Sequence, residues 1–343
     1  SLTDKNNYEW LSGFVNDHMV KYAVAQAEIS VTWNSNSFTF TDSVAQQSTP
    51  VLTGVSPLYN SELLIENFKT VVYTDAECTH IVNEGTANAG KVTAAGAYYI
   101  KVTDYTVNGG EKGNYVLNYD KADAYLVYPF TIEQLAIEKP TTGTVTIEFN
   151  GSTFDFYAVA TNAENGFTLP LKPQLTITAA AVDGKETMRD AATYKVTVSP
   201  AGDYKWQDNT STGVVFTFVI TSKDAEFVWQ VGEYTYNGAT TYAPTIQGLN
   251  GLVSGDSVTW TITGGNQNAG NHTATGELGG THADNYNVTN KTQAFTVKKA
   301  VLGDPDMTKT AAFTRNNQTF TVAGWDEIKN KVTVASSAKN IAD

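Results

Sequence analysis

A ten-residue pattern occurs four times along the chain and restricts the fold more than any other feature. Each copy has a strand that ends in an aromatic or basic residue, then four residues, then an aromatic-x-apolar group. The alternation has the period of a β-strand, and the four-residue insert predicts a turn or bulge. Repetition on this scale predicts a tandem array of β domains. The copies are VTWNSNSFTF (31–40), IEFNGSTFDF (147–156), FVWQVGEYTY (227–236) and FTRNNQTFTV (313–322).

A second landmark, an Asn/Asp-Tyr step, stands late in each unit before a closing strand. It occurs in GNYVL (113–117), GDYKW (202–206) and DNYNV (284–288). NNYEW (6–10) matches GDYKW, so we predict that residues 1–26 form the last strands of a repeat. The fourth copy of the opening pattern (313–322) lies within residues 300–343, which we predict to form the first strands of another repeat. The predicted division is 1–26, 27–134, 135–222, 223–299 and 300–343.

Composition excludes several classes of protein. The chain has 343 residues with 22 basic and 35 acidic side chains, a net charge of -13, which argues against nucleic acid or anionic lipid as a partner. The longest apolar run, 214–220, is too short to span a membrane. Cys78 is the only cysteine, so an intrachain disulfide is excluded. No recognisable catalytic motif is present, and we expect no enzymatic activity.

The best-preserved unit, 225–299, carries four short motifs. They are Tyr236-Asn237-Gly238, Gly255-Asp256, Asn268-Ala269-Gly270 and Asn285-Tyr286. In these motifs the unit resembles the MBG/YDG-type repeats of bacterial cell-surface proteins. The resemblance is fair over 27–134 and weak over 137–222. It implies Ig-like β-sandwiches in a secreted or surface-attached, adhesin-like bacterial protein, and it implies no catalytic residues.

These observations predict an all-β chain of tandem Ig-like antiparallel sandwiches, arranged as a rod with half-repeats at both ends. The alignment places Trp33, Phe149 and Trp229 at equivalent core positions. The tyrosine of the Asn/Asp-Tyr step is predicted to be structural, with its hydroxyl bonded to a neighbouring loop as in the tyrosine corner of sandwiches. The tyrosines concerned are Tyr8, Tyr115, Tyr204 and Tyr286.

Two weaker signals have competing interpretations. Asp304 and Asp306, in LGDPDM (302–307), are candidates for a calcium site that would stiffen a junction, or form a simple Asp-Pro turn. Trp206 and Tyr204 are candidates for stacking on sugar rings. The alignment of Trp206 with Trp10 favours a repeated structural position instead.

We therefore expect a structural subunit of an extracellular or cell-surface fibre. The boldest expectation is head-to-tail self-association, in which 300–343 of one chain completes a sandwich with 1–26 of the next. A fragment cut from a longer repeat array is the plain alternative for the half-repeats. The alternative function is an adhesin or carbohydrate-binding array whose partners are host or microbial surface glycans or proteins. Apart from that calcium, no cofactor is expected.

Overall fold

The computed structural model describes residues 23–42, 46–56, 62–180 and 187–302. This part of the chain is mostly β, with one short α-helix, α1 (Phe156–Ala160). It divides into two compact units, and each is described by itself. The first comprises 1–145, 156–180 and 195–217, and the second comprises 146–155, 181–194 and 218–343. Tyr8, Asp304, Asp306 and nearly all of both half-repeats lie outside the described residues.

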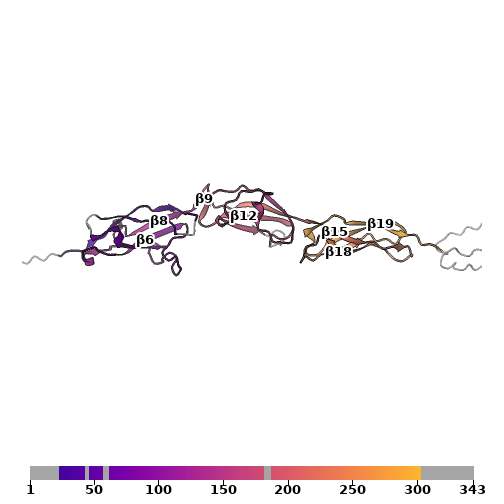
Figure 1. The fold of residues 1–343 in the computed structure, drawn as a ribbon, viewed down its shortest axis with the longest axis horizontal. Helices are drawn as coiled ribbons and strands as arrows, with labels where there is room; N and C mark the ends of the chain where they lie inside the picture. The colour runs from indigo at the N-terminus through magenta and orange to yellow at the C-terminus, as the bar shows by residue number, and fades with distance from the viewer. Residues whose placement is uncertain (1–22, 43–45, 57–61, 181–186, 303–343) are drawn as a thin grey trace, which may run out of the picture. The chain divides into compact units, whose positions relative to one another are not determined.

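We call 27–134, 135–222 and 223–299 the first, second and third repeats. The strands of the first repeat form two small pairs, β1 with β7 and β2 with β4, and a four-stranded sheet in the order β3-β8-β6-β5, in which β6 lies beside β8 (Figure 1). Its strands are β1 (Ala27–Glu28), β2 (Val31–Trp33), β3 (Ser37–Thr39), β4 (Leu52–Val55), β5 (Phe68–Tyr73), β6 (Gly96–Tyr105), β7 (Tyr115–Val116) and β8 (Val127–Glu133). Among the described residues of this repeat, 3-10 turns connect the strands at η2 (Ile65–Asn67), η3 (Lys112–Asn114) and η4 (Ala122–Ala124). Buried apolar side chains, including Ile29, Val31 and Val102, fill the core.

The second repeat has a four-stranded sheet in the order β10-β14-β12-β11 and a parallel pair, β9 with β13. Its strands are β9 (Leu135–Ile137), β10 (Thr144–Glu148), β11 (Leu175–Ala180), β12 (Ala192–Pro200), β13 (Tyr204–Trp206) and β14 (Val214–Thr221), with a 3-10 turn η5 (Lys172–Gln174). Aromatic rings dominate its interior. Phe216 packs against Phe156 and Phe167 in the first unit, and Phe218 packs against Phe154 and Tyr194 in the second.

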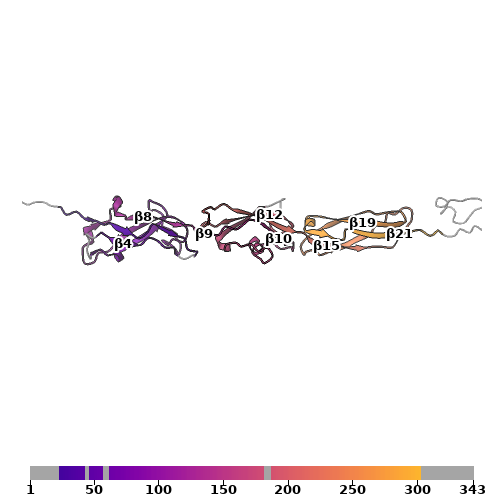
Figure 2. The same cartoon turned by 90° about the horizontal axis from the view of Figure 1, so that it is seen from above.

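The third repeat consists of two sheets in the orders β17-β15-β20 and β16-β21-β19-β18. In the second of these sheets, β19 lies beside β21 (Figure 2). Its elements are β15 (Lys223–Gln230), β16 (Tyr234–Thr235), β17 (Thr245–Asn250), β18 (Thr259–Thr263), β19 (Gly270–Gly279), η6 (Ala283–Asn285), β20 (Tyr286–Val288) and β21 (Thr292–Lys298). One buried cluster lies around Phe227 and another around Phe295. Trp229 and Ile262 contact both clusters, so the two sheets face a shared interior.

The prediction of purely antiparallel sheets was wrong at the edges. β3 pairs parallel with β8 and β16 with β21, and the short pairs β1–β7, β9–β13 and β15–β20 are parallel as well. In the first and third repeats a bulge lies just before Trp33 and just before Trp229. Beyond it the chain leaves one sheet and joins the edge of the other. Alternating apolar residues look the same in a parallel and an antiparallel edge strand, so the sequence pattern did not reveal direction.

The alignment of Phe149 with the two tryptophans was also wrong. The backbone N–H of Phe149 donates to the carbonyl of Thr221 at 2.9 Å, at the end of the closing strand. Phe40 makes the same bond to Glu133 at 2.8 Å, and Tyr236 makes it to Lys298 at 2.9 Å. Phe149 therefore corresponds to Phe40 and Tyr236. The second repeat carries EKPTTG (138–143) where the others carry their tryptophan.

Trp33 and Trp229 do occupy equivalent positions. Both indoles are half-buried. The Trp33 indole N–H donates to the carbonyl of Tyr125 at 2.9 Å, and that of Trp229 donates to the carbonyl of Asn290 at 3.0 Å. Each tryptophan thus ties the opening strand to the loop before the closing strand of the same repeat.

Candidate functional site

A polar cluster with several buried side chains lies where the second repeat meets the third, entirely within the second compact unit. Asn285, in the Asn/Asp-Tyr step, is 1% exposed. Its side-chain oxygen accepts a hydrogen bond from the backbone N–H of Ala191 at 2.8 Å, and its amide donates to Asp190 at 2.9 Å. A buried amide has to find partners for both its donor and its acceptor. Here residues of the preceding repeat supply both.

Arg189 links the same two repeats through charge. Its guanidinium pairs with Asp190 at 2.7 Å and with Asp256 at 2.5 Å, and its Nε–H donates to the carbonyl of Gly151 at 3.1 Å. The Asp256 side chain is 0% exposed. A carboxylate without water needs a cation and hydrogen bonds to remain charged. The guanidinium also lies 5.5 Å from the centre of the Phe149 ring.

Tyr286 completes the cluster. Its hydroxyl donates to Asp256 at 2.7 Å and accepts from the backbone N–H of Val253 at 3.0 Å. Its ring packs edge-on against Phe149, with centroids 5.7 Å apart and planes at 82°. Burial, together with the hydrogen bond to Asp256, raises the pKa of Tyr286 to about 12. Burial acts against the charge of Asp256, but the hydrogen bonds from Arg189 and Tyr286 outweigh it and lower its pKa.

A second cluster of the same design lies where the first repeat meets the second, within the first unit. The carboxylate of Asp203 accepts a hydrogen bond from the backbone N–H of Ala95 at 2.8 Å. The ring of Tyr204 packs edge-on against Phe40, with centroids 5.6 Å apart and planes at 85°. The hydroxyl of Tyr204 donates to Asp42, a residue of the first repeat. Burial and that bond raise the pKa of Tyr204 to about 12.

We call these two clusters the junctions. In each, an Asx side chain binds a backbone N–H of the preceding repeat, and the next tyrosine packs on an aromatic ring of that repeat. Sequence reasoning marked Tyr204 and Tyr286 as structural, with the hydroxyl bonded to a neighbouring loop. The Tyr286 hydroxyl does bond Val253 and Asp256 in such a loop, whereas the Tyr204 hydroxyl bonds Asp42 of the preceding repeat. The sequence reasoning did not foresee this contact between repeats. It missed Asp42 and Arg189. Arg189 is one of only two arginines in the chain, and that rarity was a usable signal.

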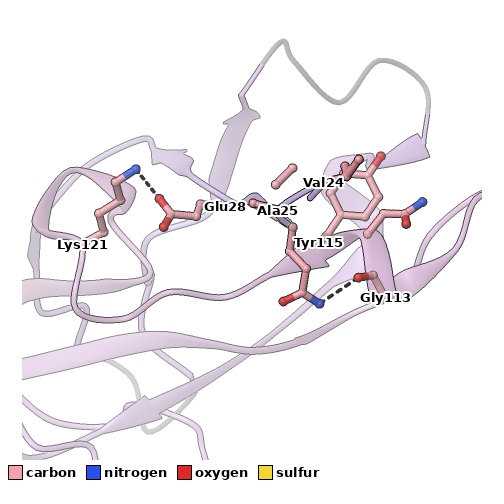
Figure 3. Close-up of a pocket in the computed structure, with 9 residues that line it drawn as sticks. Val24, Ala25, Glu28, Gly113, Tyr115 and Lys121 are labelled. Atoms are coloured by element: carbon pink, nitrogen blue, oxygen red, sulfur yellow. Dashed lines mark hydrogen bonds and ion pairs between the residues drawn. The ribbon is translucent and has the colours of Figure 1, made fainter. Parts of the chain in front are cut away.

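The first repeat carries the same step, Asn114-Tyr115, beside an open pocket of about 850 Å³ (Figure 3). The hydroxyl of Tyr115 donates to Glu62 of its own repeat at 2.5 Å. On the pocket wall Gln26 donates to the carbonyl of Gly113 at 2.8 Å, and Glu28 pairs with Lys121. The pocket is lined by Val24, Ala25, Gln26, Ala27, Glu28, Gly113, Asn114, Tyr115 and Lys121. It therefore lies at the position that corresponds to the junctions of the other two repeats.

The proposed sugar-stacking pair is not available for stacking. Trp206 is 0% exposed, and its indole N–H donates to the carbonyl of Thr212 at 2.9 Å. Tyr204 is buried against Phe40 in the junction. A ring without an exposed face cannot stack on a sugar, so that interpretation was wrong. Trp10, with which the sequence aligns Trp206, lies outside the described residues.

Other kinds of site find little support in the described ranges. Within residues 23–42, 46–56, 62–180 and 187–302, no three His, Cys, Asp or Glu side chains are grouped closely enough to hold a metal ion. No helix in the same ranges is both long and apolar enough to cross a membrane.

Comparison with known proteins places the chain in no family. No family model matches it, and no curated protein matches it significantly. A solved structure from Bacteroides ovatus, the mixed-linkage glucan utilization locus protein SGBP-B in complex with a mixed-linkage heptasaccharide, aligns with 84% of this chain and 70% of that chain. The identity is 12% and the TM-score is 0.13, and a likeness this weak carries no argument.

Proposed function

We propose that the chain is a structural subunit of a bacterial extracellular or cell-surface fibre, built from tandem Ig-like sandwich repeats. The observation that supports this most is the repeated junction. At each of two successive contacts between repeats, an Asx side chain accepts a hydrogen bond from an alanine N–H of the preceding repeat. The tyrosine that follows the Asx residue packs edge-on against an aromatic ring of that repeat. These contacts join one repeat to the next.

The junctions would resist bending because they leave few polar groups unpaired. Asn285 and Asp256 are buried and bonded across the junction or within it, so separating the repeats would expose them or strip their partners. Removing one member of a buried ion pair typically costs about 3–5 kcal/mol. Inter-domain contacts are usually looser than this. A chain whose role is mechanical continuity benefits from such contacts.

The surface setting comes from the resemblance of 225–299 to MBG/YDG-type repeats, and the low content of charged residues, 17%, is compatible with it. A glycan-binding array is the alternative, but burial of Trp206 removes the ring on which that reading depended.

The test is direct imaging of the purified chain, together with a glycan array. Negative-stain electron microscopy over a range of concentrations should show filaments, and labelled protein should bind no glycan above background. Particles that stay monodisperse at every concentration while binding one glycan class specifically would replace the fibre role with the adhesin role.

A further inference from the structure

The third repeat has a backbone N–H, that of Ala269, at the position from which Ala95 and Ala191 donate hydrogen bonds in the two junctions. In the first repeat the Tyr98 hydroxyl donates to the carbonyl of Ala94 at 3.1 Å, and in the second the Tyr194 hydroxyl donates to that of Asp190 at 2.9 Å. In the third repeat the Nε2 of His272 lies 2.7 Å from the carbonyl of Asn268. The residue after each of these carbonyls is an alanine. Those alanines are Ala95, Ala191 and Ala269.

Two of these alanines have known roles. The N–H of Ala95 donates to Asp203, and the N–H of Ala191 donates to Asn285, in each case the Asx residue of the following repeat. By position, Ala269 presents the third such N–H.

The third repeat also has an aromatic ring at the position of the junction rings, and this ring is more exposed to solvent. Tyr236 occupies the place of Phe40 and Phe149, as the shared bond to the closing strand shows. Phe40 is 5% exposed and Phe149 is 1% exposed, because the tyrosine of the next repeat covers each of them. Tyr236 is only half-buried and packs on the core of its own repeat. A tyrosine here adds a hydroxyl that suits a partly wet contact.

We propose that Tyr236, Asn268 and Ala269 form a docking surface for an Asn/Asp-Tyr step, and that Asn7-Tyr8 of a second copy of the chain occupies it. The inference deepens the proposed fibre function and rests on it. Asn7 would accept a hydrogen bond from the Ala269 N–H, and Tyr8 would pack edge-on against Tyr236. Both contacts repeat those of the two junctions, here on the third repeat.

Two details select this occupant over the other steps. The surface most resembles the end of the first repeat, because Gly96 and Gly270 share an unusual backbone angle, with φ of 154° and 146°. The step bound at the end of the first repeat lies in GDYKW (202–206), and NNYEW (6–10) is the segment that shares its Tyr-x-Trp pattern.

Charge is compatible with that choice. At the junction between the second and third repeats, the neutral Asn285 faces the charged Asp190. At the proposed surface Asn268 stands in the place of Asp190, so Asn7 would meet a neutral amide. Two amides can exchange donor and acceptor without placing a buried charge.

A disulfide trap in the full chain tests the contact. In a Cys78→Ser background, Tyr8→Cys and Tyr236→Cys are combined, the protein is oxidised, and multimers are separated by size with and without reductant. We expect a ladder of multimers that collapses on reduction. The matched control replaces Tyr236→Cys with Tyr119→Cys, at an exposed tyrosine of the first repeat, and should give no ladder.

Other products of the trap would contradict the proposal. A ladder formed by Tyr115→Cys with Tyr236→Cys, but not by Tyr8→Cys, would assign the surface to the step of the first repeat. A cross-linked monomer would mean that the occupant is the same copy of the chain.

A second measurement avoids cysteine. Asn7→Ala should weaken self-association in sedimentation velocity about tenfold, the size expected for one lost hydrogen bond, whereas the adjacent Asn6→Ala should leave it unchanged. Equal effects of the two variants would overturn the proposal. Filaments without a Tyr8–Tyr236 cross-link would disprove the docking surface and leave the fibre function standing. A cross-link between copies without filaments would support the docking surface and disprove the fibre function. Absence of the cross-link and of filaments would disprove the docking surface and the fibre function together.

Discussion

The side-chain oxygen of Asn285 accepts the backbone N–H of Ala191 at 2.8 Å, so a residue in one repeat satisfies the main chain of the repeat before it. Asp203 does the same for Ala95 at the same distance. An unpaired buried backbone N–H costs free energy comparable to a lost hydrogen bond. The stability of neighbouring repeats is therefore coupled at these two points.

The two Asx residues should respond differently to exchange of their side chains. Asp203→Asn keeps the acceptor for Ala95 and should change the free energy of unfolding by less than about 1 kcal/mol. Asn285→Asp removes the donor to Asp190 and adds a carboxylate beside Asp190 and Asp256, which should cost about 3 kcal/mol. Urea unfolding of the full chain, monitored by hydrogen exchange, would measure the change in unfolding free energy for both variants. Equal costs would show that charge at the junction does not matter.

Removal of the arginine should weaken the junction between the second and third repeats. Arg189→Ala leaves the buried side chain of Asp256 without its cation, and we expect hydrogen exchange around β20 to report a loss of about 3 kcal/mol in stability. Lys298→Ala, which breaks an exposed pair with Glu233, is the control and should cost no more than about 0.5 kcal/mol. A similar small effect for both variants would contradict the role given to Arg189.

Alkaline pH should destabilise both junctions. The pKa values of Tyr204 and Tyr286 are raised to about 12 in the folded chain, against an ordinary value of 10.0. Since the folded state holds these protons more tightly, their contribution is complete below pH 10 and is lost as the pH rises toward about 12. Each tyrosine should lower the unfolding free energy by about 1.4 kcal/mol per pH unit in that window. Tyr204→Phe and Tyr286→Phe should each flatten the decline, measured by chemical unfolding at a series of pH values.

Trp206 and Trp229 should differ in how much they stabilise the fold. Trp206→Ala empties a fully buried site and should cost about 3–5 kcal/mol. Trp229→Ala, at a half-buried site, should cost less. Thermal unfolding would compare them. A glycan array on the Trp206→Ala variant, under conditions in which it stays folded, should match that of the unaltered chain, and selective loss of a glycan signal would return Trp206 to a binding role.

The predicted completion of a split repeat between chains can be tested by truncation. Deleting residues 1–26 should leave the β-rich circular dichroism spectrum of the remaining repeats intact and abolish assembly, because an isolated strand pair is marginal in water and needs a partner. Deleting 300–343 should do the same, and mixing the two truncated chains should give only short oligomers. Assembly of the 1–26 deletion to full-length filaments would disprove the mechanism.

The sequence by itself determined that the chain is mostly β and where its recurrent landmarks fall. Period-two alternation and turn residues act locally, so they can be read without knowing what a strand packs against. The Asn/Asp-Tyr step was recognised in the same way, as a residue pair at a constant place before a closing strand. Trp33 and Trp229 each stand next to a bulge in the opening strand of their repeat, a local feature that the shared sequence pattern accompanies.

Only the tertiary structure decided what those landmarks touch. The parallel edge strands, the position of Phe149 and the burial of Trp206 depend on contacts between residues distant in sequence, which a periodic pattern does not encode. Arg189 and Asp256 are far apart along the chain, and neither has a local signature that points to the other. Their pairing became visible when folding placed a buried carboxylate and a guanidinium on either side of one junction, where loss of water makes each charge require the other.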